Sequence, residues 1–277
     1  MHGYRRSTDR DEKHQSRADY TLVETVSTRI PTTLVQIRGA AEGADLPPDL
    51  PAADEWLGRA TGEIATNHRS SWVRLHHTAT GGVYRKVYCY ATWRERLANL
   101  GRHTAPWAAS RARREFDALR WLAAAGLPAA EPLAVFEARR FGFLTAAVLW
   151  TRAWPGTSLD RLLPTLAPGD RERLATALGT FVATLHDRGF RDRNLDLRNL
   201  LARPHGDGWE LTKIDSPRCR IVRPGPADDA LRAADWRRLL PQLASFGLAE
   251  LTLRAAAASS PAAPRPPAPA PPPADRR

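Results

Sequence analysis

One segment constrains the fold of this chain more than any other: residues 190–215, which read FRDRNLDLRNLLARPHGDGWELTKID. It opens with a loop rich in acids and amides, whose polar members are Asp192, Asn194, Asp196 and Asn199. An apolar Leu200-Leu201 pair, a turn rich in Pro and Gly, and the run WELTKI follow, and Asp215 ends the run. The pattern predicts a loop, a strand, a turn and a second strand that ends on a carboxylate.

This order of groups matches what phosphoryl transfer needs: Mg²⁺ held by an Asp and an Asn, and a carboxylate near the attacking hydroxyl. In protein kinases the base Asp stands five residues before the metal-binding Asn, and a second metal-binding Asp follows on the next strand. Asn199 and Asp215 match the two metal-binding positions. Counting back five residues from Asn199 leads to Asn194, which cannot accept a proton as a carboxylate does. We therefore expect the base to be displaced or missing.

The runs NLDLRNLLAR and KIDSPR resemble the lipopolysaccharide kinase family, the Kdo and heptose kinases that are related to protein kinases. The family pattern is close to H-x-D-L-N-L-R-N, so the Asp and the first Asn look exchanged in RNLDLRN. Asp196 would point to the same side as Asn194 if the loop is extended, because side chains alternate along an extended chain. Asp196 is therefore the first candidate for a displaced base and Asp192 the second. Either acid could instead cap a turn or pair with a neighbouring arginine.

The resemblance also implies a strand lysine and a helix glutamate that together hold the α- and β-phosphates of ATP. Lys86 lies in the middle of VYRKVYCY, a run rich in β-branched and aromatic residues after a Thr-Gly-Gly turn. The chain has 41 basic residues, of which three are lysines, so a lysine on this strand favours a specific role. An outward-facing strand lysine is the structural alternative.

The partner glutamate is predicted on a helix within residues 110–122, where apolar residues recur at helical spacing and Gly126 and Pro128 follow. Glu115 is the acid most expected to face inward. Upstream, residues 63–75 suggest two strands around a turn at 67–71, in the place of a glycine-rich loop, although no G-x-G-x-x-G is present. Backbone amides of this turn, with Ser70 and Ser71, are the candidate phosphate contacts.

Composition limits the class of protein. There is no run of 18 apolar residues and residues 1–17 lack the apolar core of a signal peptide, so we expect a cytoplasmic protein, with association at the inner membrane surface as a further expectation. Cys89 and Cys219 are too few for a disulfide framework or a zinc site and are read as packing residues. The net charge of +11 favours an anionic partner without choosing among ATP, a phosphorylated sugar, a membrane and nucleic acid.

We predict an α+β, bilobal protein-kinase-like fold with a small β-rich N-lobe and a helical C-lobe. Residues 1–19 are expected to be disordered, 20–150 to form the N-lobe with its sheet and one helix, 151–254 the C-lobe, and 255–277 a Pro- and Ala-rich disordered tail. Helices are predicted at 159–166, 171–188 and 230–240, the last ended or kinked by Pro241. Asp235 on that last helix is a candidate to brace the catalytic loop, and an exposed helix acid is the alternative. His186 is read as a packing or hydrogen-bonding residue.

The resemblance implies an ATP- and Mg²⁺-dependent kinase that phosphorylates a sugar hydroxyl of a glycolipid or surface glycan. One alternative is a pseudokinase, in which Asn194 at the base position leaves a nucleotide- or partner-binding module. A second alternative is a basic adaptor for nucleic acid or an anionic surface, although nucleic acid is the less expected partner. The acceptor and the oligomeric state do not follow from the sequence.

Overall fold

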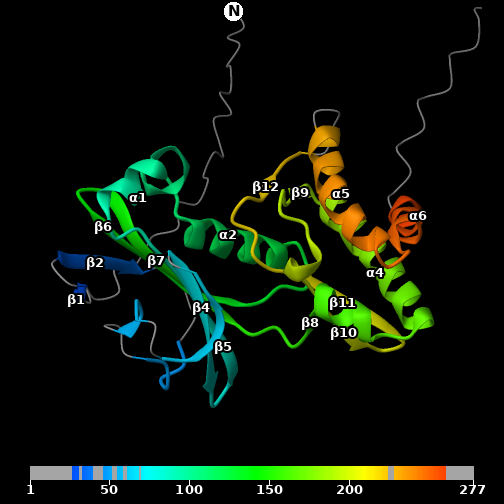
Figure 1. Cartoon of the computed structure of the whole chain (residues 1–277), viewed down its shortest axis with the longest axis horizontal. Helices are drawn as coiled ribbons and strands as arrows, with labels where there is room; N and C mark the ends of the chain where they lie inside the picture. The colour runs from blue at the N-terminus through cyan, green and yellow to red at the C-terminus, as the bar shows by residue number, and fades with distance from the viewer. Residues whose placement is uncertain are drawn as a thin grey trace, which may run out of the picture.

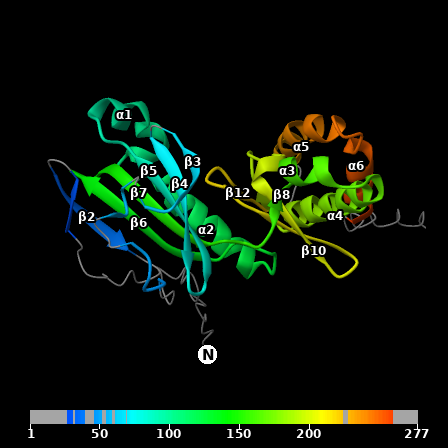
Figure 2. The ribbon, with the colours of Figure 1, turned by 60° about the horizontal axis from the view of Figure 1, so that its bottom comes forward.

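The computed structural model describes residues 27–30, 33–39, 46–51, 55–58, 61–68, 70–223 and 228–259. These residues form two lobes, a β-sheet lobe with two α-helices and a mainly helical lobe, joined through the end of strand β7 and the segment after it (Figure 1). The view in Figure 2 separates the lobes most clearly. The predicted α+β, bilobal architecture is confirmed.

The first lobe is built on an antiparallel sheet of seven strands in the order β1-β2-β6-β7-β5-β4-β3. The strands are β1 Ser27–Ile30, β2 Thr33–Gly39, β3 Glu63–Asn67, β4 Ser71–Thr78, β5 Gly81–Cys89, β6 Pro132–Arg140 and β7 Phe143–Arg152. On β5, Val83 and Val87 face one side of the sheet with Trp150, whereas Tyr88 faces the other side with Phe116. This alternation places Lys86 on the same face as Tyr88.

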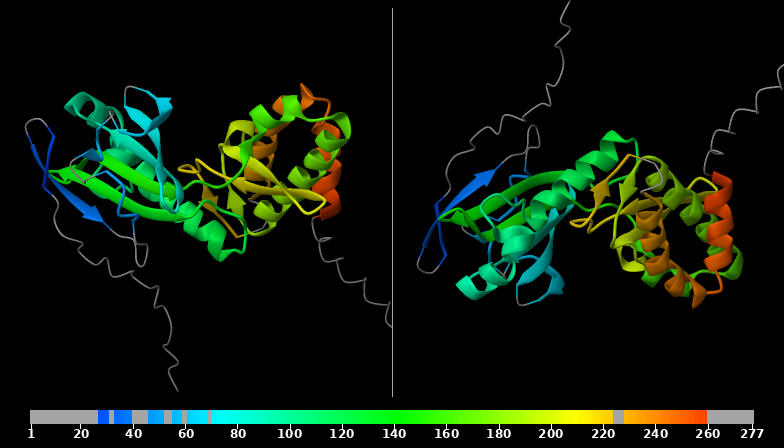
Figure 3. Two further views of the ribbon diagram at one scale, coloured as in Figure 1. Left: turned by 90° about the horizontal axis from the view of Figure 1, so that it is seen from below. Right: turned by 90° about the horizontal axis from the view of Figure 1, so that it is seen from above.

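Helix α2, Arg111–Ala124, covers that second face of the sheet, as Figure 3 shows from below and above. It begins at Ser110, whose hydroxyl accepts a hydrogen bond from the amide of Arg113 at 3.0 Å, a typical N-cap. Ala112 and Phe116 pack against Tyr88 and other core residues of the sheet. Because Glu115 is buried on this same side of the helix, α2 directs an acid toward β5. The short helix α1, Trp93–Ala98, and a π-helical turn η2, Leu100–Thr104, connect β5 to α2.

The second lobe has a leucine-rich core between four helices and two small sheets. Its helices are α3 Leu159–Leu162, α4 Pro168–Asp187, α5 Asp229–Ala244 and α6 Ala249–Ser259, with 3-10 turns η3 Leu163–Thr165 and η4 Leu197–Asn199. Its strands are β8 Thr157–Ser158, β9 Phe190–Arg191, β10 Leu200–His205, β11 Gly208–Lys213 and β12 Arg220–Ile221. The antiparallel β10–β11 hairpin is the loop, strand, turn and strand that the sequence predicted.

Two glycines shape this lobe. Gly189 ends α4 with a φ of 89°, in the left-handed region, and its carbonyl accepts from the amide of Val222 at 2.9 Å. The chain thereby turns from α4 into the acidic loop. At Gly179, a Cβ atom would stand 2.3 Å from the carbonyl oxygen of Thr252, so helices α4 and α6 approach each other more closely than any side chain would permit.

Some predicted boundaries differ from the structure. Residues 255–259 belong to α6, so the predicted disordered tail was placed too early, because its alanines favour a helix that packs on α4. Helix α5 continues past Pro241 to Ala244 rather than ending there. Strands β1 and β2 lie within the predicted N-lobe, whereas residues 1–19 and 260–277 lie outside the described residues.

Candidate functional site

The centre of the candidate site is Lys86, which links the two lobes. Its Nζ donates a hydrogen bond to Glu115 Oε2 at 2.8 Å and another to Asp215 Oδ1. Burial alone would lower the pKa of Lys86, but the negative charges of Glu115 and Asp215 outweigh it and hold that pKa well above its usual value. The ammonium is therefore charged, and strand β5, helix α2 and the segment after β11 meet at one atom.

Asp215 follows β11 and adopts a left-handed backbone conformation with a φ of 56°. A positive φ is uncommon outside glycine, although Asp tolerates it better than most residues. The amide of Ile214 donates to the carbonyl of Asn199 at 2.9 Å, which fixes this segment against the acidic loop. Burial raises the pKa of Asp215, but the ammonium of Lys86 more than compensates, so the pKa lies below its usual value and the carboxylate is ionised.

Asn194 and Asn199 complete this cluster. The side-chain amide of Asn194 donates to the carbonyl of Asp215 at 3.2 Å and to its Oδ2 at 3.3 Å. The side-chain amide of Asn199 donates to the carbonyl of Asn194 at 3.2 Å. The structure thus brings Lys86, Glu115, Asn194, Asn199 and Asp215 together.

The oxygen atoms of this cluster suit a magnesium ion. Mg²⁺ prefers hard oxygen ligands, and this cluster offers two: the carboxylate of Asp215 and the side-chain oxygen of Asn199. Among the described residues, no hydrogen-bond donor contacts that oxygen of Asn199. The described residues contain no group of three or more His, Cys, Asp or Glu side chains that could hold a metal by themselves. A metal at this site would therefore depend on Asp215, on an asparagine and on phosphate oxygens supplied by a ligand.

Asp192 belongs to the loop, and its side chain faces Lys213. Its side chain is buried and stands 3.0 Å from the Nζ of the equally buried Lys213. Burial raises the pKa of Asp192. Its carboxylate faces Lys213 and is closed to solvent, so an acceptor hydroxyl would not reach it in this arrangement.

Asp196 is placed in a third environment. Its Oδ1 accepts from the backbone amide of Arg198 at 3.0 Å and so caps turn η4, and its Oδ2 accepts from the side chains of Arg198 and Arg238 at 2.9 and 3.0 Å. Although burial opposes it, these bonds lower the pKa of Asp196. The structure does not join Asp196 to the Lys86 cluster.

Asp235 supports the loop from behind, as the sequence suggested. Its Oδ1 accepts from the amide of Arg193 at 2.8 Å, and its Oδ2 accepts from the amide of Asp192 at 3.2 Å and lies 3.1 Å from Nε2 of His186. The side chain is 1% exposed. The predicted position of Asp235 behind the loop and the predicted hydrogen bonding of His186 are both confirmed.

Ser70 lies in the turn between β3 and β4, and Ser71 is the first residue of β4, next to the end of β5. Ser71 pairs with Tyr88 in the sheet, and the carbonyl of Ser70 accepts from the amide of Cys89 at 2.9 Å. Their hydroxyls make no hydrogen bond with the Lys86 cluster among the described residues. Their predicted contact with phosphate stays a prediction.

Sequence reasoning missed Lys213 and Arg191. Lys213 is one of the three lysines of the chain and forms a buried ion pair with Asp192, and Arg191 forms one with Asp228. The position of Lys213 could have indicated a buried ion pair. Lys213 stands two residues before Asp215, where the strand pattern would otherwise carry another apolar residue.

These features define a protein-kinase-like fold. The β-sheet lobe carries a lysine that bonds to a helix glutamate. The helical lobe supplies a loop with two asparagines and an aspartate that follows a strand. The profile of the Lipopolysaccharide kinase (Kdo/WaaP) family matches residues 57–253, and the chain belongs to this family.

A solved structure described as "WaaP in complex with acyl carrier protein" has a similar fold. It superimposes with a TM-score of 0.50 at 18% sequence identity, covering 72% of this chain and 79% of the other. No curated protein sequence matches this chain.

Proposed function

We propose that this protein transfers the γ-phosphoryl group of ATP, with Mg²⁺, to a sugar hydroxyl of a glycolipid or surface glycan. The observation that carries the proposal is the contact of Lys86 with Glu115 and Asp215 at the junction of the lobes. A charged lysine oriented by a helix glutamate is suited to hold the α- and β-phosphates of ATP, because its ammonium offers a compact positive charge in a fixed place.

The metal is assigned to Asp215 and Asn199. When bound, Mg²⁺ would neutralise charge on the β- and γ-phosphates. The chain's own residues do the rest: Lys86 binds phosphate, Glu115 orients Lys86, and Asn194 holds Asp215 through its side-chain amide. Phosphates that bind to Lys86 would compete with Asp215 for its ammonium group.

Asn194 decides between an active kinase and a pseudokinase. It occupies the position of the base, and its amide donates to Asp215 rather than accepting a proton. Phosphoryl transfer depends mainly on positioning and electrostatic stabilisation, so the loss of a base lowers the rate without removing the chemistry. We therefore favour a slow kinase, and a nucleotide-binding pseudokinase is the second candidate. A basic adaptor would not need the Lys86–Glu115 pair.

The first lobe also carries an apolar surface that suits a membrane-bound acceptor. Trp107, Phe141, Leu97 and Trp93 are 85%, 76%, 61% and 45% exposed. They converge on the turn between β6 and β7, because Gly142 in this turn lies against Pro106, and the rings of Trp93 and Phe143 are 5.5 Å apart. We name Trp93, Leu97, Trp107 and Phe141 the aromatic surface.

Arg140 adds positive charge to the aromatic surface and stacks over Phe141 at 5.2 Å. Exposed aromatic and leucine side chains beside arginines favour the interface of an anionic bilayer. No described helix is long and apolar enough to cross a membrane. We therefore propose peripheral binding through the aromatic surface, which would present the site to a glycolipid.

The proposed activity is tested by thermal-shift titration with ATP, with and without Mg²⁺, since a ligand of the native state raises its melting temperature. We expect an Mg²⁺-dependent shift that Lys86→Met and Asp215→Ala abolish and that Asp117→Asn, on the exposed side of α2, retains. No shift at millimolar ATP in the wild type would reject both kinase-fold candidates. Turnover is then measured as Mg²⁺-dependent release of ADP in the presence of glycolipid vesicles, and ATP binding without any turnover would identify the pseudokinase.

Membrane binding is tested by sedimentation with vesicles of phosphatidylcholine and phosphatidylglycerol. Trp107→Ser with Phe141→Ser should release the protein from vesicles, whereas Ile64→Ser, which removes an apolar side chain that is 64% exposed on β3, should not. Equal binding of both variants would reject the aromatic surface as the contact.

A further inference from the structure

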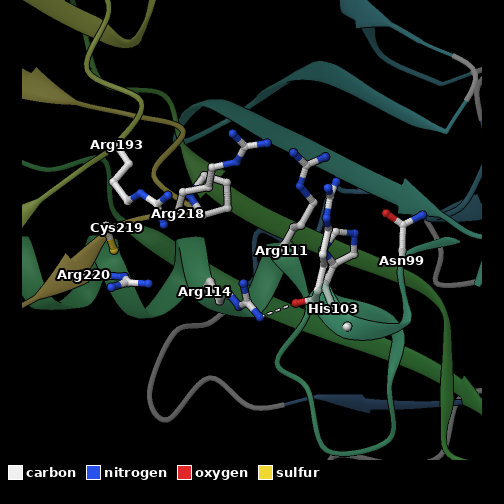
Figure 4. Close-up of a pocket in the computed structure, with 11 residues that line it drawn as sticks. Asn99, His103, Arg111, Arg114, Arg193, Arg218, Cys219 and Arg220 are labelled. Atoms are coloured by element: carbon white, nitrogen blue, oxygen red, sulfur yellow. Dashed lines mark hydrogen bonds between the residues drawn. The ribbon is translucent and has the colours of Figure 1, made fainter. Parts of the chain in front are cut away.

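A strongly basic pocket lies where the two lobes meet beside the N-terminal end of α2. It has a volume of about 640 Å³. Its lining consists of Asn99, Gly101, Arg102, His103, Arg111, Arg114, Arg193, Pro217, Arg218, Cys219 and Arg220. Six of these residues are arginines and none is acidic. Figure 4 shows the labelled arginine side chains of both lobes around the same opening.

Most of these arginines lack a negative partner. Arg102, Arg193, Arg218 and Arg220 form no ion pair within the part of the chain that the structure describes. Arg114 donates to the backbone carbonyl of Arg102 at 2.5 Å, and Arg111 lies over the ring of Tyr88 at 5.5 Å. Like charges at this density repel one another, so the arrangement gains stability from an anion that binds among them.

His103 reports on the potential inside the pocket. Burial and the positive charges of Arg111, Arg114 and other pocket arginines lower the pKa of His103 to about 4. The histidine is therefore neutral near pH 7, and the positive charge of the pocket comes from arginines, which stay charged at any physiological pH.

The pocket is separate from the Lys86 cluster but linked to it. Lys86, Glu115, Asn199 and Asp215 do not line it. Arg111 stands one helical turn before Glu115 on α2, and Arg193 comes directly before Asn194 in the loop, whereas Arg218 and Arg220 follow Asp215. A ligand that binds several of these arginines at once would therefore connect α2 to the loop that contains Asn199 and to the segment that follows Asp215.

We propose that this pocket is a second anion site, which binds a phosphate-bearing ligand and thereby holds α2 against the catalytic loop. Guanidinium groups bind phosphate oxygens in pairs, and arginines from several directions suit a dianion. A volume of about 640 Å³ lies within the range of ligand pockets, so it admits a phosphorylated sugar or a diphosphate and not only a single phosphate group. Two sources carry this chemistry: a soluble phosphorylated compound, and a phosphate group on a glycolipid.

The test measures binding rather than catalysis, so it does not depend on the proposed kinase activity. Isothermal titration with pyrophosphate compares the wild type with Arg102→Gln/Arg218→Gln, which removes one arginine from each lobe. We expect the dissociation constant to rise about tenfold or more, because each charge-assisted hydrogen bond contributes about that factor. The matched control is Arg237→Gln/Arg254→Gln, which removes the same charge from exposed positions on α5 and α6 and should bind as the wild type does.

Lys86→Met separates this site from the nucleotide site. Pyrophosphate binding that survives Lys86→Met but is lost in Arg102→Gln/Arg218→Gln supports the pocket, and the reverse pattern would assign the anion to the Lys86 cluster and overturn the proposal. Far-ultraviolet circular dichroism confirms that each variant is folded.

A second arm identifies the source of the phosphate. Glucose 6-phosphate in solution is compared with phosphatidylcholine vesicles that contain a bisphosphorylated glucosamine lipid. Arginine-dependent binding of glucose 6-phosphate indicates a soluble ligand, and arginine-dependent binding of the vesicles alone indicates the glycolipid. If the arginine variant and its control bind equally in the pyrophosphate titration and in both of these assays, the pocket is not an anion site.

Discussion

The side-chain amide of Asn194 donates a hydrogen bond to Oδ2 of Asp215 over 3.3 Å, at the position where the kinase pattern places a carboxylate. Asparagine satisfies the negatively charged Asp215 without metal, whereas a second carboxylate there would repel it. Asn194 therefore holds Asp215 by a hydrogen bond but offers no carboxylate that could act as a base.

Asn194→Asp tests this relationship. We expect a loss of about 1–3 kcal/mol in the free energy of unfolding without metal, because a hydrogen bond is replaced by like charges. Mg²⁺ should restore most of this loss and should raise the rate of phosphoryl transfer, since general base catalysis contributes about 10²-fold or more. Asn194→Ala loses the hydrogen bond without adding charge and should show neither response to Mg²⁺. Identical behaviour of the two variants would contradict the assignment of Asn194 to the base position.

Asp235 holds the loop by accepting from two backbone amides and contacting His186. In Asp235→Asn, one of two acceptor oxygens becomes a donor, so at least one buried amide loses its partner, at a cost of about 1–3 kcal/mol. We expect turnover to fall because the loop loosens, while ATP affinity changes little, since Lys86 and Glu115 remain in place. Asp229→Asn, on the exposed first turn of the same helix, is the control. Steady-state kinetics with nucleotide titration distinguishes the two effects, and an unchanged turnover number would exclude a bracing role for Asp235.

Because Lys213 and Asp192 form a buried ion pair, we expect that replacing one of them lowers stability strongly and that replacing both restores much of it. Lys213→Met leaves the Asp192 carboxylate buried without a countercharge, which should cost about 3–5 kcal/mol in urea denaturation. The double variant Lys213→Met/Asp192→Leu should regain much of that loss, because apolar replacement of a buried ion pair is often neutral. If the loss of stability in the double variant equals the sum of the losses in Lys213→Met and in Asp192→Leu alone, then the two side chains are not coupled.

The structure brings Lys86, Glu115 and Asp215 into contact, and the sequence placed Lys86 and Glu115 correctly on their elements because those elements have strong local signals. Lys86 lies on an alternating strand and Glu115 on the apolar face of a capped helix, so the pattern of each element sets the direction of the side chain. Asp235 was also predicted, since it lies near the middle of an amphipathic helix.

Asp196 shows where local reasoning fails. Its proposed direction assumed an extended loop, whereas residues 197–199 form a 3-10 turn that Asp196 itself caps. One of its partners, Arg238, comes from α5, more than 40 residues further along the chain. No local sequence pattern predicts a pair between residues so far apart in the chain. The turn and the ion pair are therefore visible only in the structure.

Strand β7 and helix α6 were missed for a related reason. The middle of β7 is buried continuously, so the alternation that identifies a half-exposed strand is absent. In the sequence, the alanines of α6 resemble the start of a low-complexity tail. In the structure, their small side chains allow α6 to lie close to Gly179 of α4, and this contact depends on tertiary packing.

The pH dependence of stability tests the environment of His103. The unfolded chain binds a proton at this histidine near pH 6.5, whereas the folded protein binds it only near pH 4, so stability from this group falls as the pH is lowered through that window. The positive charges of Arg102 on η2, Arg111 and Arg114 on α2, and Arg218 after β11 all act on the ring. The centroid of this ring lies 5.4 Å from that of Tyr90, and the two rings are tilted relative to each other. His103→Phe keeps an aromatic ring and should lose less stability than the wild type between pH 6.5 and pH 4.

The contribution of the arginines to this shift is measured by NMR titration of the His103 ring. Arg218→Gln should raise the pKa of His103, because it removes one of the positive charges that oppose protonation. In the wild type, saturating pyrophosphate should also raise the pKa of His103, since a bound anion offsets the same positive charges. The control variant Arg237→Gln should leave the pKa of His103 unchanged. A His103 pKa that stays near 6.5 in the wild type would mean that the pocket is more open to solvent and less positive than its geometry indicates.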